Sequence, residues 1–380
     1  MSLSVHGLSG CVRAALLALL AGLLVACAGG AEKPKPTELP PNAALIGVRL
    51  AWSGSIGAVT FPLDVRVNGS TVALASSDGT VLALDAGTGR EIWRTKAGEA
   101  LAAGVGSDGK TTVVVTRSNL VVAFNDGREI WRQKIPAQIY TAPLVAGERV
   151  FVLAADRSVT ALDGLTGRKL WAQQRPGDPL VLRQSGVILA VGDTLVVGLS
   201  GRMVGMNPLN GSVRWEVPLA TPRGTNDIER LVDLVGTVSR DGSNVCARAF
   251  QANVGCVDTS RGSLVWGQAS NGMVGVAGNA KSLFGVESDG KVVAWNRISG
   301  ERLWISERLR YRGLSSPVVA GRSVVVGDNT GLLHLLSVED GSPLNRLTTD
   351  GSAIAAPPVM SGDTLIAVTR NGGVFGFRPE

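Results

Sequence analysis

Residues 82–93 read LALDAGTGREIW, and variants of this stretch recur along the chain. The pattern is an apolar strand, an Asp or Asn, a turn that contains Gly, and a second strand that ends in Trp. Full copies occupy residues 161–171, 206–215, 257–266 and 295–304, a shortened copy occupies 124–131, and a copy without the Trp occupies 336–345. Such self-similarity is the signature of a repeat architecture.

Each element of the repeat has a physical reason. An Asp or Asn side chain accepts hydrogen bonds from the backbone that follows it, and the Gly supplies the positive φ that closes the turn. The two flanking strands therefore form a hairpin. The Trp carries a large ring that suits packing against a neighbouring repeat.

A second hairpin precedes each of these. Residues 143–147, 317–321 and 358–362 each begin a strand pair, and tight-turn dipeptides such as Asp78-Gly79 follow the next apolar strand. The spacings between successive Trp residues from Trp93 to Trp304 are 38, 40, 44, 51 and 38 residues. Four strands in about 40 residues are typical of a β-propeller blade.

The number of blades follows from the third strand of each unit. Its pattern occurs eight times, at residues 81–84, 121–124, 159–162, 204–206, 254–257, 292–295, 333–336 and 374–377. The last copy ends at Glu380 without an outer strand, whereas residues 48–52 read VRLAW and supply one. We therefore expect an all-β, eight-bladed propeller of four-stranded antiparallel blades, closed by the N-terminal strand. A seven-bladed ring with an extra hairpin is the alternative.

The N-terminal segment predicts export. Arg13 precedes an apolar run at residues 14–26, which is too short to span a bilayer but typical of a signal peptide. Residues 24–27 read LVAC and resemble the bacterial lipobox, which implies that Cys27 is acylated. Position 28 is Ala and not Asp, which by the same resemblance favours the outer membrane. The expected domains are a signal peptide (1–26), an acylated and Pro-rich tether (27–44) and a propeller (45–380).

No catalytic or metal-binding constellation is visible in the sequence. His6 and His334 are the only histidines, and no His/Cys cluster has metal-ligand spacing. The net charge of +6 comes from scattered Lys and Arg, which predicts a solvated surface and no nucleic-acid partner. We expect no metal, no cofactor and no enzymatic activity.

Cys246 and Cys256 lie on two strands joined by a short turn. Cys11 lies in the signal peptide and Cys27 in the lipobox, so this pair remains for a disulfide in an oxidising compartment. A register slip of one residue would point the two thiols to opposite faces of the sheet. The alternative is therefore two small buried core residues.

The repeat resembles that of the quinoproteins, Ala-x-Asp-x-x-Thr-Gly-x-x-x-Trp. Enzymes with this repeat use pyrroloquinoline quinone, a catalytic Asp, calcium ligands and often a vicinal Cys pair. This chain is much shorter and has no adjacent cysteines. The repeat therefore implies shared architecture, because fold does not imply function. A periplasmic quinoprotein-like enzyme and a ligand-binding propeller remain the alternative functions.

Lipobox, tether and eight quinoprotein-like blades together resemble the BamB family of outer-membrane assembly lipoproteins. Two irregular stretches add to the resemblance: residues 180–183 read LVLR and residues 228–233 read IERLVD. In that family such stretches help to form the surface that meets the barrel-assembly protein BamA. The resemblance implies contact residues at Leu180, Leu182, Arg183, Arg230 and Asp233. The family's second Asp is replaced by Val235 here.

The resemblance implies a non-catalytic scaffold, lipid-anchored to the outer membrane and facing the periplasm. Its expected partners are BamA, other subunits of the barrel-assembly complex and unfolded outer-membrane proteins, which an exposed blade edge would bind by strand addition. From the residues alone, an Arg flanked by exposed Leu suits a binding hot spot. The alternative is that the two Leu residues pack into a blade and Arg183 is merely solvated.

Overall fold

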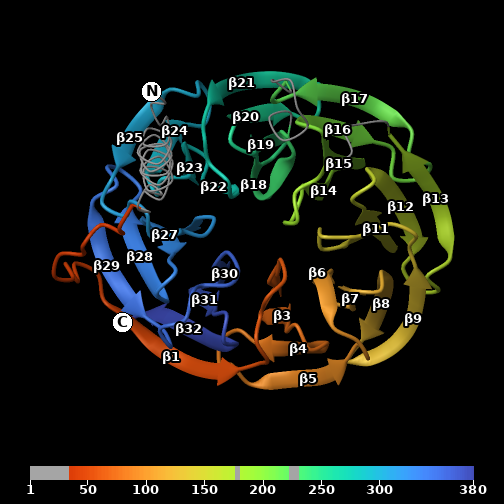
Figure 1. Ribbon diagram of the computed structural model, residues 1–380, viewed down its shortest axis with the longest axis horizontal. Coiled ribbons are helices and arrows are strands. Elements are labelled where there is room, and N and C mark those ends of the chain that lie inside the picture. Colours follow the sequence, from red (N-terminus) through yellow and green to blue (C-terminus); the bar gives the residue numbers. More distant parts are fainter. Residues whose placement is uncertain (1–33, 176–179, 222–230) are drawn as a thin grey trace, which may run out of the picture. The chain divides into compact units, whose positions relative to one another are not determined.

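Eight four-stranded antiparallel sheets surround a central axis (Figure 1). The computed structural model describes residues 34–175, 180–221 and 231–380. Residues 37–380 form one compact unit, which is the propeller. The described part of the chain has no helix long and apolar enough to cross a membrane. The predicted signal peptide and Cys27 lie outside the described residues.

The strands follow the chain blade by blade. Blade 1 contains β2 (Arg66–Asn68), β3 (Thr71–Ala75), β4 (Thr80–Asp85) and β5 (Glu91–Lys96), and blade 2 contains β6 (Leu101–Ser107), β7 (Thr111–Thr116), β8 (Leu120–Asn125) and β9 (Arg128–Lys134). Blade 3 contains β10 (Leu144–Ala146), β11 (Arg149–Leu153), β12 (Ser158–Asp163) and β13 (Lys169–Gln174), and blade 4 contains β14 (Ile188–Val191), β15 (Thr194–Leu199), β16 (Arg202–Met206) and β17 (Val213–Pro218).

The other half of the ring has the same order. Blade 5 contains β18 (Leu234–Asp241), β19 (Asn244–Ala249), β20 (Asn253–Asp258) and β21 (Ser263–Ala269), and blade 6 contains β22 (Val276–Gly278), β23 (Ser282–Val286), β24 (Val292–Asn296) and β25 (Arg302–Ser306). Blade 7 contains β26 (Val318–Ala320), β27 (Ser323–Gly327), β28 (Leu332–Ser337) and β29 (Pro343–Thr348), and blade 8 contains β30 (Val359–Ser361), β31 (Thr364–Val368), β32 (Gly373–Pro379) and β1 (Val48–Ser55).

The ring closes as the sequence predicts. The N-terminal strand β1 pairs antiparallel with the C-terminal strand β32, with Leu50 opposite Phe377 and Trp52 opposite Gly376. Blade 8 is therefore built from both ends of the chain, and β1 covers the edge that β32 would otherwise expose. Eight blades are present, so the seven-bladed alternative is wrong.

Burial changes from the middle of each blade to its rim. The second and third strands, such as β3 and β4, are almost entirely buried because neighbouring blades cover both of their faces. They are correspondingly continuous apolar runs. The fourth strands, such as β5, alternate between half-buried and exposed residues because they form the rim of the ring.

The Trp that ends an outer strand packs against the turn Gly of the next blade. A Cβ on Gly89 would lie 2.5 Å from the ring of Trp52, and a Cβ on Gly167 would lie 2.7 Å from the ring of Trp131. Both glycines also have φ near +70°. These positions therefore accept only Gly without strain.

Hydrogen bonds fix the same contacts. The indole nitrogens of Trp52, Trp131, Trp171, Trp266 and Trp304 donate to the carbonyl oxygens of Ala86, Gly164, Pro208, Arg297 and Val338, respectively, at 2.8–3.1 Å. Each of these bonds joins an outer strand to the turn of the following blade. The Trp of the repeat motif thus holds one blade to the next through a hydrogen bond.

The Asp of the motif holds the turn from inside. The Asp85 carboxylate accepts hydrogen bonds from the amide (2.9 Å) and the hydroxyl (2.7 Å) of Thr88. The same bonds form between Asp163 and Thr166, at 2.9 and 2.8 Å. These Thr bonds are the main reason that the pKa of each carboxyl lies below its ordinary value.

Residues 37–46, called here the N-terminal strap, lie along the outer strand β29 of blade 7 (Figure 1, red). The Leu45 amide donates to the Leu344 carbonyl at 2.7 Å, and the Arg346 guanidinium donates to the Pro40 carbonyl at 2.8 Å. The sequence predicts a tether that extends to residue 44. In the structure, the tether's last residues are docked on the propeller.

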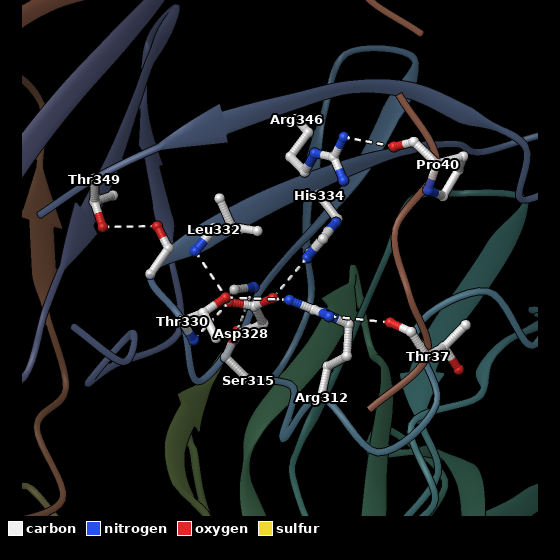
Figure 2. A network of polar contacts seen from close by, with 12 residues as sticks. Thr37, Pro40, Arg312, Ser315, Asp328, Thr330, Leu332, His334, Arg346 and Thr349 are labelled. Atoms are coloured by element: carbon white, nitrogen blue, oxygen red, sulfur yellow. Dashed lines mark hydrogen bonds and ion pairs between the residues drawn. The ribbon is translucent and has the colours of Figure 1, made fainter. Parts of the chain in front are cut away.

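A buried ionic network holds the start of the strap (Figure 2). Arg312 donates from Nε to Asp328 at 2.8 Å and from Nη1 to the Thr37 carbonyl at 3.1 Å. His334 also contacts Asp328, through Nε2 at 2.9 Å. Burial alone would raise the pKa of Asp328, but hydrogen bonds from His334, the Leu332 amide, Thr330 and Arg312 outweigh it and hold that pKa well below its ordinary value.

The Trp–Gly contact predicts a position-dependent cost of adding a methyl group. Gly167→Ala places a Cβ against Trp131 at a left-handed φ, and we expect it to lower the free energy of unfolding by about 2–5 kcal/mol. Gly147→Ala is the control, because its φ is also positive but nothing lies within 4 Å of the added Cβ. We expect that variant to lose only about 1–2 kcal/mol of unfolding free energy, from the backbone conformation alone. Equal losses in chemical denaturation would contradict the interpretation.

The Asp328 network predicts that the free energy of unfolding depends on pH. The pKa of Asp328 is lower in the folded state than in the unfolded chain, so its stabilisation is present above about pH 4 and is lost as the pH falls further. We expect the free energy of unfolding to fall less between pH 5 and pH 3 in Asp328→Asn than in the wild type. Asp363→Asn, at an exposed carboxylate, is the matched control for the removal of one Asp charge. Parallel wild-type and Asp328→Asn curves would show that Asp328 contributes no pH dependence.

Candidate functional site

Leu180, Leu182 and Arg183 lie in the connection from β13 to β14, and Asp233 lies at the end of the connection from β17 to β18. These segments lead from blade 3 to blade 4 and from blade 4 to blade 5. Both therefore run over the same face of the propeller. Arg230 lies outside the described residues. The two connections are called here the 3–4 and the 4–5 connection.

The two connections are hydrogen-bonded to one another. The Leu182 amide donates to the Asp233 carboxylate at 3.1 Å. A few residues further on, the Gly236 amide donates to the Ser185 carbonyl at 2.9 Å. Segments about 50 residues apart in the sequence thus form one continuous surface.

A buried Arg lies beneath this surface. Arg157, in the hairpin between β11 and β12, donates from Nε to the Ser200 hydroxyl at 2.6 Å and from Nη2 to the Leu180 carbonyl at 3.3 Å. The same Nη2 lies 3.6 Å from an Asp233 carboxylate oxygen. The sequence patterns do not single out Arg157. The signal that could have identified it is its position in a turn where blades 1, 6, 7 and 8 have Gly.

The predicted contact residues differ in exposure. Leu180 is 41 % exposed, which is high for a large apolar side chain, and Arg183 is also exposed. The Arg183 guanidinium carbon lies 5.5 Å from the centre of the Tyr140 ring, a cation–π arrangement. Leu182 is half-buried. The surface therefore presents an apolar residue and a cation on an aromatic support.

A small cavity of about 60 Å³ lies between the two connections and blade 3. Its lining includes both apolar and polar groups, among them Tyr140, Leu153, Arg157, Leu182, Ser200 and Asp233. Leu182 and Asp233 thus face inward to this cavity, whereas Leu180 and Arg183 are the more exposed members of the predicted set.

The 3–4 connection also reaches the central axis. The Ser185 hydroxyl donates to the Asp64 carboxylate of blade 1 at 3.2 Å, and the Gln184 amide nitrogen donates to the Met273 carbonyl at 3.2 Å. Burial raises the pKa of Asp64, while the Arg66 charge and the Ser185 hydrogen bond oppose that rise. Contacts on both sides of the axis hold this connection in place.

Val235 stands where the resembled family has its second Asp. Its side chain is 1 % exposed, and an isolated antiparallel bridge pairs it with Gly186. A carboxylate at this position would be buried between the two connections. In the described part of the surface, the acidic contribution from this stretch therefore comes from Asp233.

The two remaining cysteines are bonded. Cys246 in β19 lies directly opposite Cys256 in β20, both side chains are fully buried, and the structure joins them by a disulfide. The register question that the sequence leaves open is decided by this pairing. The disulfide links the two central strands of blade 5, next to the strand that follows Asp233.

The described residues contain no cluster of three or more His, Cys, Asp or Glu side chains that could hold a metal ion. The features that stand out in this part of the chain are instead exposed side chains held by a rigid hydrogen-bonded support. Such an arrangement suits recognition of another macromolecule.

The fold defines an eight-bladed β-propeller, and the joined 3–4 and 4–5 connections are its candidate binding face. The sequence profile of the family described as outer membrane protein assembly factor BamB matches residues 77–306. A protein of that name from Burkholderia pseudomallei is 35 % identical over 374 residues, which cover 97 % of this chain and 98 % of that protein. The chain belongs to the BamB family.

Solved structures support the fold. The crystal structure of BamB from Moraxella catarrhalis is 24 % identical, covers 87 % of this chain and 99 % of its own, and superposes with a TM-score of 0.80. A quinohemoprotein alcohol dehydrogenase from Comamonas testosteroni has a TM-score of 0.68 at 14 % identity, covering 90 % of this chain and 78 % of its own. At these identities both comparisons concern the fold alone.

Proposed function

We propose that this chain is a non-catalytic scaffold lipoprotein of the outer-membrane barrel-assembly machinery, which docks on BamA and assists the insertion of outer-membrane proteins. The observation that carries the proposal is the joined 3–4 and 4–5 connections, which expose Leu180 and Arg183 on a rigid support. The relatives' name, outer membrane protein assembly factor, agrees with this role.

The chemistry of this surface suits a protein partner. Leu180 offers apolar area that gains free energy when it leaves water, at roughly 25 cal/mol per Å². Arg183 offers a planar guanidinium that can bind a carboxylate through two parallel hydrogen bonds. Arg is enriched among interface hot-spot residues, and neighbouring contacts that exclude water strengthen such a residue.

The proposed place of action is the periplasmic side of the outer membrane. Acyl chains on Cys27 would anchor the chain, and two or more chains give stable anchoring. The tether would then be shorter than residues 27–44, because the N-terminal strap is docked on blade 7.

The outer strands of the blades are the proposed sites for incoming barrel strands. A strand edge offers unpaired backbone groups to an extended segment of another chain. The N-terminal strap lies along β29, so that strand's edge is already engaged. Strand addition is therefore expected on the rims of other blades, and backbone-mediated crosslinks to substrate are its test.

The alternative of a quinoprotein-like enzyme rests on the shared propeller alone. The quinohemoprotein dehydrogenase resembles this chain at 14 % identity, which carries the fold and not the activity. The observation that favours a scaffold is the exposed composite surface. A scaffold role requires no reacting group, only a rigid and specific contact.

A pull-down from native membranes in mild detergent tests the docking surface. We expect the wild type to retrieve BamA and Arg183→Glu to retrieve at least about tenfold less, because reversing the charge removes about 1.4 kcal/mol or more of binding free energy. Arg322→Glu is the control, since Arg322 is exposed in the hairpin between β26 and β27, at the other end of the strands.

The two negative outcomes have different meanings. If the wild type and both variants retrieve BamA equally, the docking surface lies elsewhere on the propeller. If the wild type retrieves no barrel protein at all, the assembly role itself fails and a ligand-binding propeller becomes the leading function.

A further inference from the structure

We propose that Arg157 is a positioning residue that holds the 3–4 and 4–5 connections in register, so that they present one docking surface. The inference rests on the proposed function for its biological meaning, but its geometry stands independently. Arg157 contacts the backbone of Leu180, the side chain of Asp233 and the hydroxyl of Ser200. It thus joins blade 3, both connections and blade 4.

The hairpin that carries Arg157 shows that this residue is not there for the turn. Six blades use the same hairpin between their second and third strands, with a left-handed residue whose amide bonds the carbonyl three residues earlier. That residue is Gly79, Asn119, Arg157, Gly290, Gly331 and Gly372 in blades 1, 2, 3, 6, 7 and 8, respectively. Gly has no penalty there, and Asn adopts the left-handed region more readily than other residues with a side chain.

Arg157 has both a backbone cost and a burial cost. Its φ is +64°, a left-handed backbone conformation that is unfavourable for a residue with a long side chain. Its side chain is only 8 % exposed, so a guanidinium is removed from water. Residues in a strained backbone conformation persist where surrounding contacts offset their free-energy cost, and such positions cluster at functional sites. Two of the contacts that offset these costs, to the Leu180 carbonyl and the Asp233 carboxylate, lie in the two connections.

Asp233 completes the arrangement from the other side. One carboxylate oxygen accepts from the Leu182 amide at 3.1 Å, and the other lies 3.6 Å from Arg157. Its side chain is 18 % exposed. Asp233, which sequence analysis placed among the contact residues, therefore acts with Arg157 as a support. Leu180 and Arg183 are left as the side chains that meet the partner.

The substitution Arg157→Gly tests this role without disturbing the turn, because Gly is the usual residue at this position. We expect the amide of Leu182 to exchange hydrogen at least about tenfold faster, because its acceptor Asp233 loses the contact with Arg157. We expect the affinity of the full-length chain for purified BamA to fall by a similar factor. The melting temperature of the propeller should stay within a few degrees of the wild type, since relief of backbone strain offsets lost contacts.

Asn119→Gly is the matched control. It makes the same change of a left-handed residue to Gly in the equivalent hairpin of blade 2. We expect it to leave both the exchange of the Leu182 amide and the affinity for BamA unchanged. Arg157→Lys is the second variant, which keeps the charge but not the fork of donors, and it should lie between the wild type and Arg157→Gly.

Each outcome decides the question. An unchanged Leu182 exchange rate in Arg157→Gly overturns the positioning role. Faster exchange with unchanged affinity reduces Arg157 to a local structural residue and also overturns it. Faster exchange in a chain whose wild type does not bind BamA supports the positioning of the two connections and rejects the proposed partner. If Arg157→Gly does not fold, the same measurements on Arg157→Lys distinguish the same three outcomes.

Discussion

The contact between a Trp ring and the turn Gly of the next blade is the interaction on which the propeller depends. The Trp131 ring covers Gly167 so closely that a Cβ would lie 2.7 Å from it, and its indole nitrogen donates to the Gly164 carbonyl. A single blade is a twisted sheet that cannot cover its own apolar faces. Adjacent blades can do so only if their spacing is constant, and the Trp–Gly contact sets that spacing.

Closure of the ring also depends on a contact between a Trp ring and a turn Gly. The last blade has no outer strand of its own, so β1 must pair with β32 and place Trp52 against Gly89. The N-terminal strap then continues along β29 of blade 7 and is held by Arg312 and Arg346. The segment that would leave the membrane anchor is thus fastened to two neighbouring blades.

The candidate functional surface lies where the repeat is interrupted. Blades 3 to 5 are joined by connections that do not follow the repeat, and a Gly of the repeat is replaced by Arg157. A rigid propeller makes such exceptions possible, because loops that carry function need a scaffold that does not move with them. Leu180 and Arg183 are therefore displayed on loops, while Arg157 and Asp233 hold these loops from below.

Sequence periodicity alone was enough to determine the blade number, the strand order and the closing strand. These features are local: an Asp, a Gly and a Trp at fixed offsets specify the same hairpin wherever they occur. The opposite positions of Cys246 and Cys256 depended on a register that could slip by one residue, and only the structure decided it. The link from Arg157 to Asp233 and the docking of the N-terminal strap were also decided by tertiary structure. Their partners lie 76 and about 300 residues apart in the chain, and no local pattern encodes which distant side chains a closed ring brings together.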